Sequence, residues 1–184
     1  SGLPAEGEID AHLGESTMEL TQVFRGERLP NIVVGVDGTV VATFGTSSVK
    51  ARLSKDAGRT WGEEIVISKP GFQCGGLTVD EGTGAIFAFV EERHPPAPIH
   101  VFKSVDHGKS WKKVEVVIKP DSKGNQPSMH MNDHGITLRH GKHAGRIIRP
   151  SRWYAGANAR EKWPEHYTNA IFSDDGGKTW ETSN

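Results

Sequence analysis

Short runs of β-branched and aromatic residues, separated by turns rich in Gly and Asp, recur along most of this chain. The first two runs cover residues 31–34 and 39–44, and they are joined by Asp37-Gly38, a pair typical of tight β-hairpins. Runs of this length and composition predict strands, and no stretch has the period of an amphipathic helix. The pattern therefore predicts an all-β fold.

The predicted strands fall into three groups with the same internal order. In each group a hairpin joins the first two strands, a third strand follows, and a polar turn leads to a fourth strand. We expect four-stranded antiparallel blades over residues 23–70, 71–120 and 130–184, after an N-terminal arm over residues 1–22. The second blade is expected to close with Val114–Ile118. In the third blade we expect the chain to stop, four residues after Trp180, before a fourth strand.

The polar turn of each group repeats one octad, Ser-x-Asp-x-Gly-x-Ser/Thr-Trp. The octads start at residues 54, 104 and 173, which gives spacings of 50 and 69 residues. Repeats of about this length are typical of propeller blades. The Asp is placed to accept backbone N–H bonds within a tight turn, the Gly allows an unusual backbone angle, and the Trp packs against neighbouring strands. We therefore interpret the octads as structural turns.

These octads resemble the Asp boxes of the sialidase superfamily and related β-propellers. The resemblance extends from about Phe24 to Trp180. It includes Arg28-Leu29-Pro30, which is similar to the R-[IL]-P motif that opens sialidase propellers, and residues 133–138 with 145–148, which resemble the third blade. The resemblance implies a β-propeller of six blades. This chain would hold about three of them, and the others would belong to a second polypeptide or would have been lost.

The composition excludes several classes of partner. The net charge is −1 and charges of both signs alternate, so neither nucleic acid nor an acidic membrane is expected as a partner. No apolar run is long enough to span a bilayer, and the residues given predict no signal peptide. The single cysteine, Cys74, excludes an intrachain disulfide framework. The resemblance implies a secreted or periplasmic location of the bacterial type.

The histidines lack the spacing of a transition-metal site, so we expect no metal of that kind and no cofactor. Asp and Asn side chains leave a structural calcium ion open as an alternative.

Blade topology predicts where the chemistry lies. First strands start and second strands end at one face, the mouth, whereas the octads lie at the opposite face. The stretches that meet at the mouth carry Arg, His, Glu, Asp and Tyr side chains. Such a pocket suits an anionic sugar, because arginine holds a carboxylate with two hydrogen bonds and aromatic rings pack on the sugar. The predicted substrate-binding residues are Arg28, Asp133, Arg149, Arg152 and Trp153.

The resemblance assigns Arg28 to the carboxylate of the substrate. It also implies a general-acid Asp between the second and third strands of the first blade, but the loop Gly45–Ser48 contains no carboxylate. Glu91 or Glu92 could replace it if burial raises the pKa, and His134 could do so because its ordinary pKa lies near neutral. A solvated charge at the rim, for either Glu, and a structural hydrogen bond, for His134, remain as alternatives.

The resulting functional hypothesis is a sialidase-like exo-glycoside hydrolase that acts on a terminal acidic sugar of a glycan. One alternative is a propeller polysaccharide lyase that acts on uronates, with His134 and either Tyr154 or Tyr167 as base and acid. A non-catalytic glycan-binding propeller is the other alternative. The predicted catalytic residues are His134, Glu91 and Tyr154.

Overall fold

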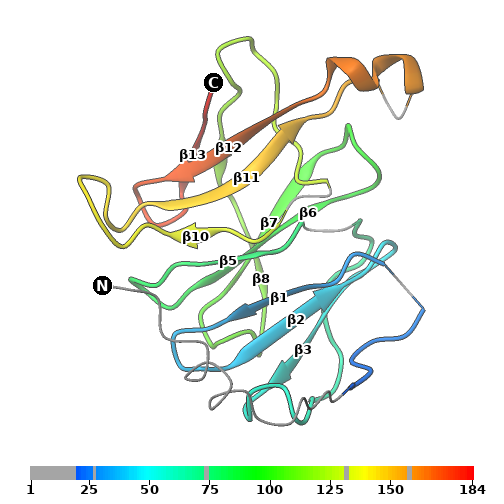
Figure 1. The fold of residues 1–184 in the computed structure, drawn as a ribbon, viewed down its shortest axis with the longest axis vertical. Helices are drawn as coiled ribbons and strands as arrows, with labels where there is room; N and C mark the ends of the chain where they lie inside the picture. Colours follow the sequence, from blue (N-terminus) through cyan, green and yellow to red (C-terminus); the bar gives the residue numbers. More distant parts are fainter. Residues whose placement is uncertain (1–19, 27, 73–74, 131–132, 157–158) are drawn as a thin grey trace, which may run out of the picture.

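The computed structural model describes residues 20–26, 28–72, 75–130, 133–156 and 159–184. Most of the expected N-terminal arm, and Cys74, lie outside these residues. The described chain forms three sheets, and Figure 1 shows their inner strands side by side, with β5 between β1 and β10. The predicted all-β class is confirmed.

The first two sheets have the expected order of four antiparallel strands. The second strand of each is buried along its whole length, because it lies between neighbours within its sheet and is covered on both faces. The strands of the first sheet are β1 (Asn31–Val34), β2 (Val40–Phe44), β3 (Val49–Ser54) and β4 (Ile65–Ser68). Those of the second are β5 (Leu77–Val79), β6 (Ile86–Glu91), β7 (Ile99–Ser104) and β8 (Lys112–Val114).

The third sheet has five strands. Four are antiparallel, and the short strand β9 pairs in parallel with β13 at the outer edge. The strands are β10 (Ile136–Thr137), β11 (Ile147–Trp153), β12 (Tyr167–Ser173), β13 (Thr179–Thr182) and β9 (Val117–Ile118). A 3-10 helix, η2 (Arg160–Glu165), lies between β11 and β12.

Two strand predictions were wrong. The third blade does have a fourth strand, because β13 begins inside the octad at Thr179 and pairs Thr182 with Ile171. The segment Val114–Ile118 does not form one strand. Its first residue ends β8, whereas Val117 and Ile118 cross to the third sheet, where the Val117 amide donates to Lys178 O at 2.9 Å.

The Asp boxes are hydrogen-bonded as the sequence predicts. In the second box, Asp106 accepts from the Ser110 amide at 2.9 Å, and its other oxygen accepts from the Ser110 hydroxyl at 2.6 Å. The Trp111 indole donates to Gly108 O at 3.0 Å. The amide and indole bonds recur in the other two boxes, around Asp56 and Asp175, and the hydroxyl bond recurs at Asp56. Gly108 has a φ of 89°, which explains the glycine in the motif.

The third box also joins two blades. Trp180 is fully buried, and its ring meets Phe87 and Phe89 of β6 edge-on, with centroids 5.9 and 4.9 Å apart. These rings belong to an apolar cluster that also includes Met129, Ile147 and Ile171. A second cluster packs the first sheet against β5 and β6. The blades are therefore held together by apolar contacts between adjacent sheets.

Candidate functional site

A cavity of about 740 Å³ opens at the face where β1 begins and where β2, β6 and β11 end. This volume lies within the range of small-molecule sites, about 300–1,000 Å³. The described residues that line the cavity include no carboxylate. They are Arg28, Leu29, Thr46, Phe72, His94, His130, Arg152, Tyr154, Trp163 and His166.

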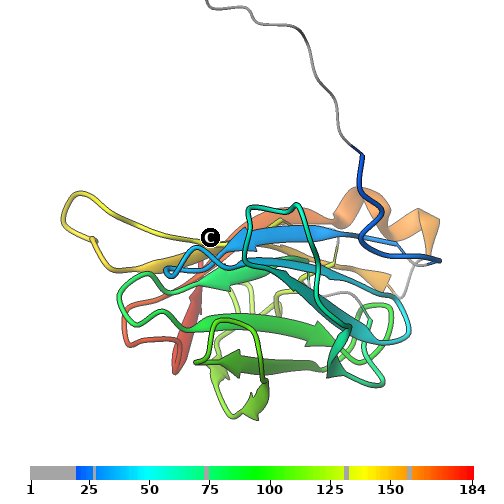
Figure 2. The ribbon, with the colours of Figure 1, turned by 90° about the horizontal axis from the view of Figure 1, so that it is seen from below.

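The Asp boxes lie at the other end of the strands, as the topology predicts. Ser54, where the first box begins, pairs with Val40 at the start of β2, whereas Phe44 ends β2 at the cavity side. The second box meets the β1–β2 turn, where His107 Nδ1 lies 3.3 Å from an Asp37 oxygen. In Figure 2 the yellow β10–β11 turn extends to the left and the orange helix η2 lies to the right, which separates the two faces.

Tyr154 and His94 form a polar pair inside the cavity. The Tyr154 hydroxyl lies 3.4 Å from His94 Nε2, and His94 Nδ1 lies 3.0 Å from Pro95 O. A carbonyl oxygen can only accept, so Nδ1 carries a proton, and in the neutral ring Nε2 accepts from the phenol. Burial raises the pKa of the Tyr154 hydroxyl; Arg152 opposes the shift and Glu91 adds to it. Tyr154 is therefore a protonated phenol, a proton donor, at neutral pH.

Arg152 reaches the cavity beside Tyr154. Its guanidinium lies 5.3 Å from the Tyr154 ring centroid and donates to His166 Nδ1 at 3.0 Å. His166 Nε2 lies 3.0 Å from Ala155 O, which fixes this ring as the Nε2–H tautomer. Helix η2 adds Trp163, whose side chain stays about half exposed at the rim. Together with exposed Arg28, these groups give the cavity a positive and aromatic lining.

Glu91 is buried behind the lining rather than exposed in the cavity. One carboxyl oxygen accepts from Ser128 Oγ at 2.6 Å and from the Met129 amide at 3.3 Å. The other oxygen is buried without a hydrogen-bond partner among the described residues. Burial raises the pKa of Glu91 to about 7, although Ser128, Met129 and Arg149 oppose the shift. The expected rise in pKa occurs, but a fully buried side chain does not reach a substrate in this geometry.

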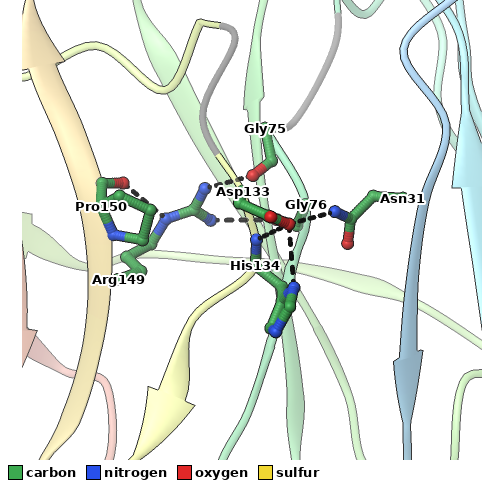
Figure 3. A network of polar contacts seen from close by, with 7 residues as sticks. All are labelled: Asn31, Gly75, Gly76, Asp133, His134, Arg149 and Pro150. Atoms are coloured by element: carbon green, nitrogen blue, oxygen red, sulfur yellow. Dashed lines mark hydrogen bonds and ion pairs between the residues drawn. The ribbon is translucent and has the colours of Figure 1, made fainter.

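His134 and Asp133 lie outside this cavity. Figure 3 shows that one Asp133 oxygen accepts three bonds, from the His134 amide at 2.7 Å, from His134 Nδ1 at 2.8 Å and from Asn31 Nδ2 at 2.7 Å. These bonds hold the pKa of the Asp133 carboxyl below its usual value. His134 lines a separate hollow of about 330 Å³ against the inner strands β1, β5 and β10. The arrangement places both residues together, but apart from Tyr154 and the arginines of the cavity.

Arg149 has a structural position. Its side chain is fully buried, and its guanidinium donates to Gly76 O at 3.1 Å and to Gly75 O at 3.0 Å (Figure 3). The guanidinium also lies 4.7 Å from the centroid of the Phe89 ring. Arg149 therefore ties the third blade to the start of the second, and the prediction that it binds substrate does not fit its burial.

Two other candidates also lie on the far side of β11. The Trp153 ring packs on Tyr167, with centroids 5.4 Å apart, and the Tyr167 hydroxyl bonds to Asp121 and Asn125. Alternation along β11 explains this, because Arg152 and Tyr154 differ by two positions and share a face, whereas Trp153 points to the other. Glu92 instead pairs with His100 at 2.6 Å. None of these three lines the cavity.

The sequence analysis missed His130, Phe72 and His166 as site residues. His94 follows the end of β6, and His166 lies between β11 and β12, so strand direction offered a signal for those two. His130 follows a segment without strand periodicity, and only the backbone pairing of Ser128 with Arg152 brings it to the cavity.

Among the described residues, no group of three or more His, Cys, Asp or Glu side chains is arranged to hold a metal ion. In the same part of the chain, no helix has the length and apolarity required to span a membrane.

Comparison with known proteins agrees with the Asp-box geometry. Residues 171–182 match the BNR/Asp-box repeat family. A sialidase of Micromonospora viridifaciens is 31% identical over 192 residues, which cover 85% of this chain and 29% of that protein.

Solved structures agree on the fold. A Hadza microbial sialidase aligns with a TM-score of 0.64 at 18% identity, over 85% of this chain and 37% of its own. A GH43 β-1,3-galactosidase aligns with a TM-score of 0.56 at 13% identity, over 84% of this chain and 33% of its own. An ulvan lyase of polysaccharide lyase family PL25 aligns with a TM-score of 0.50 at 15% identity, over 89% of this chain and 42% of its own.

At these identities the solved structures support the propeller-like fold alone. This chain spans well under half the length of both sialidases that it matches. The repeat match and the 31% sequence identity with the Micromonospora protein indicate common ancestry. This chain is therefore a sialidase homologue that carries the BNR/Asp-box repeat.

Proposed function

We propose that this chain forms part of the substrate site of an exo-acting glycoside hydrolase that removes a terminal acidic sugar from a glycan. The observation that carries the proposal is the joint position of Arg28, Arg152 and Tyr154 in one cavity. Guanidinium groups suit a sugar carboxylate, and a protonated phenol can donate to a leaving oxygen. Phe72 and Trp163 supply the apolar walls on which a sugar ring packs.

In this mechanism the arginines orient the sugar by its carboxylate. Tyr154 donates its proton to the glycosidic oxygen as the bond to the leaving group breaks. Water adds to the sugar, and its proton returns to Tyr154 through His94 Nε2, so that the net reaction consumes one water. The loop Gly45–Ser48 contributes Thr46 to the cavity instead of a carboxylate, which is why the acid is assigned to Tyr154.

A lyase that acts on uronates is the second candidate, and the absence of carboxylates from the described lining favours it. In this reaction the arginines neutralise the uronate carboxylate and so acidify the adjacent C–H. A histidine then removes that proton, and Tyr154 protonates the leaving oxygen. The geometry points to His94 rather than His134 as the base, because His94 lines the cavity with its Nε2 3.4 Å from the Tyr154 hydroxyl, whereas His134 lines a separate hollow.

Incubation with sialylated and uronate-containing glycans separates these candidates. A released terminal sugar with one added water supports hydrolysis, and a new ultraviolet-absorbing double bond supports the lyase. Binding without any product supports a non-catalytic glycan-binding propeller.

Methyl esters of the substrate should bind about 10-fold or more weakly than the acid, and the Arg28→Lys variant should bind the acid about 10-fold or more weakly than the wild type, because the paired charge-assisted bonds are lost. Equal affinity for acid and ester would exclude the proposed anionic sugar.

The proposal includes the second polypeptide that supplies further blades. Its support is the exposure of Ile32, Val34 and Ile136 on the inner strands, each more than half exposed in this chain, since apolar side chains in such positions are usually covered. Size measurements on the native protein should then find this chain in a stable complex. Recovery of this chain by itself, with full activity, would contradict the proposed second polypeptide.

A further inference from the structure

The rim of the cavity carries an exposed tryptophan. Trp163 lines the cavity and is 48% exposed. It belongs to helix η2, which contains no buried residue, so the indole does not anchor this helix in the core. Single exposed apolar side chains are common on protein surfaces, but a Trp at the rim of a cavity offers a flat apolar face to a ligand.

Helix η2 lies in a connection that is longer than its counterparts in the other blades. The second and third strands are joined by residues 45–48 in the first blade and by residues 92–98 in the second, but by residues 154–166 in the third. Figure 1 shows the orange helix beyond the ends of β11 and β12. The first two blades form without such a helix, so its effect in the third is to add Trp163 to the cavity rim.

Several contacts fix this helix relative to the cavity. The His166 amide donates to Trp163 O at 3.1 Å. The His166 ring bonds to Ala155 O and to the Arg152 guanidinium, each at 3.0 Å. The Arg160 guanidinium lies 5.7 Å from the centroid of the indole. The indole therefore has a defined position relative to Arg152, which favours recognition of a ligand that reaches both.

The position of Tyr154 indicates which part of a substrate lies near Trp163. In the proposed reaction Tyr154 protonates the glycosidic oxygen, so the sugar that leaves with this oxygen lies beside Tyr154. The centroids of the Tyr154 and His166 rings are 4.3 Å apart, and His166 directly follows the last residue of η2. Arg28, by contrast, belongs to the segment before β1. The leaving sugar is therefore expected on the η2 side of the cavity.

We propose that Trp163 forms a subsite for the sugar next to the acidic one, the sugar that leaves with the glycosidic oxygen. A neutral hexose fits this subsite, because the C–H face of its ring is apolar and packs on an indole. The acidic ring then packs on Phe72 and the next ring on Trp163. This inference rests on the proposed function, because it requires an acidic sugar held by the arginines. Trp163 thus favours an acidic sugar within a glycan over the same sugar alone.

Calorimetry with matched thioglycosides tests the inference, because a sulfur-linked analogue resists hydrolysis. The titrations compare the methyl thioglycoside of N-acetylneuraminate with its S-linked lactoside, and the same pair made from D-glucuronate, on the native protein. The lactoside should bind the wild type about 10-fold more tightly than the methyl thioglycoside, since the contact with the indole removes apolar surface from water. Trp163→Ala should bind both members of the pair equally.

Other measurements show that the effect belongs to the indole. The Kd of the methyl thioglycoside should be the same in Trp163→Ala and wild type, which shows that the variant is folded and still holds the acidic sugar. Trp163→Phe keeps an aromatic face and should retain part of the preference for the lactoside. Glu161→Gln changes an exposed side chain of the same helix that does not line the cavity, and it should retain the full ratio of the two Kd values.

The outcomes separate this inference from the proposed function. Equal Kd values for the two analogues in the wild type overturn the subsite. If Trp163→Ala loses affinity for both analogues alike, the indole packs on the acidic sugar itself and the inference is wrong. Both results leave the proposed function intact when Arg28→Ala weakens binding of the methyl thioglycoside. If neither acidic sugar binds, or if Arg28→Ala has no effect, the proposed function fails and the inference fails with it.

Discussion

At the residue scale, the chemistry of the cavity depends on how burial sets the protonation of single side chains. Tyr154 is 7% exposed and keeps its proton, because burial raises its pKa more than Arg152 lowers it. Its hydroxyl lies 3.4 Å from His94 Nε2. The phenol is thus prepared to donate a proton and to recover one through the same contact.

We expect Tyr154→Phe to lower kcat by about 100- to 10,000-fold, the usual range for loss of general acid–base catalysis. The KM should change much less, because the aromatic ring and the arginines remain. Steady-state kinetics on the substrate found in the glycan assay measures both constants. The matched control is Tyr167→Phe, whose hydroxyl bonds to Asp121 and Asn125 outside the cavity. Comparable loss of kcat in both variants would contradict the role of Tyr154.

Glu91 gives a prediction about stability and pH. Its folded pKa of about 7 lies above the ordinary value of 4.5, so the folded state holds the proton more tightly than the unfolded state. Its contribution to stability is then complete below about pH 4.5 and is lost as the pH rises through 7. The wild type should lose about 2–3 kcal/mol of unfolding free energy from this group between pH 5 and pH 8.

Glu91→Gln removes the titration and can still accept the Ser128 Oγ bond. We therefore expect the variant to gain about 2–3 kcal/mol relative to wild type between pH 5 and pH 8. Urea unfolding at several pH values measures this difference. Glu115→Gln, at an exposed position after β8, should show no such trend. A constant difference between Glu91→Gln and wild type across this range would show that Glu91 ionises normally.

At the element scale, each Asp box is a self-contained turn. Burial alone would raise the pKa of Asp106, but hydrogen bonds from Ser110 and Ser104 outweigh it and hold the pKa at about 2. A depressed folded pKa stabilises the fold above about pH 4, and this contribution is lost as the pH falls towards 2. The carboxylate thus helps to hold the turn that leads from β7 to β8.

We expect Asp106→Ala to lower the free energy of unfolding by about 1–3 kcal/mol, because the turn amides and hydroxyls lose their acceptor. The KM of the surviving folded enzyme should stay unchanged, since the box lies at the face opposite the cavity. Val105→Ala is the control, because the Val105 side chain is 77% exposed. Thermal unfolding and steady-state kinetics together check the prediction. A higher KM at full stability would place the box in the substrate site.

Strand position relative to the box differs between the blades. In the first blade β4 starts four residues after Trp61, in the second β8 starts directly after Trp111, and in the third β13 already includes Trp180. From the sequence we expected the fourth strand of the second blade to begin at Val114, three residues after Trp111, and expected the chain to stop before such a strand in the third blade, so β13 was missed. The pairing of β13 with both β12 and β9 supplies the hydrogen bonds that start this strand early.

At the scale of the whole molecule, the inner strands of the second and third blades approach each other closely. The Gly135 amide donates to Leu77 O at 3.0 Å, which links the third blade to the second. A Cβ at position 135 would lie 2.5 Å from Thr78 Cγ2 and 2.7 Å from Arg149 Cβ. Only glycine allows the two blades to meet at this distance.

Gly135→Ala should therefore lower the free energy of unfolding by about 1–3 kcal/mol, the usual cost of overpacking. Gly62→Ala is a matched control, because its Cβ would meet only Leu53 O, at an ordinary 3.6 Å. Thermal unfolding of both variants measures the difference. Equal stability of the two variants would mean that the blades can separate slightly without cost.

The sequence by itself determined the local elements and the repeat. Alternating apolar positions, Asp-Gly turns and the octads act over a few residues, so they predict strands, hairpins and Asp boxes without any knowledge of packing. They also identified Arg28, Arg152 and Tyr154 as residues of the mouth, because strand direction alone places the ends of strands on one face.

Only the tertiary structure decided which of these side chains share a cavity. Burial removed Arg149 and Glu91 from it, alternation turned Trp153 away, and a hydrogen bond to Asp133 held His134 at the inner strands. His130 entered through a backbone pairing with β11, and β9 crossed between blades. These features depend on contacts between segments far apart in the chain, whose free energies are set by packing and desolvation rather than by local pattern.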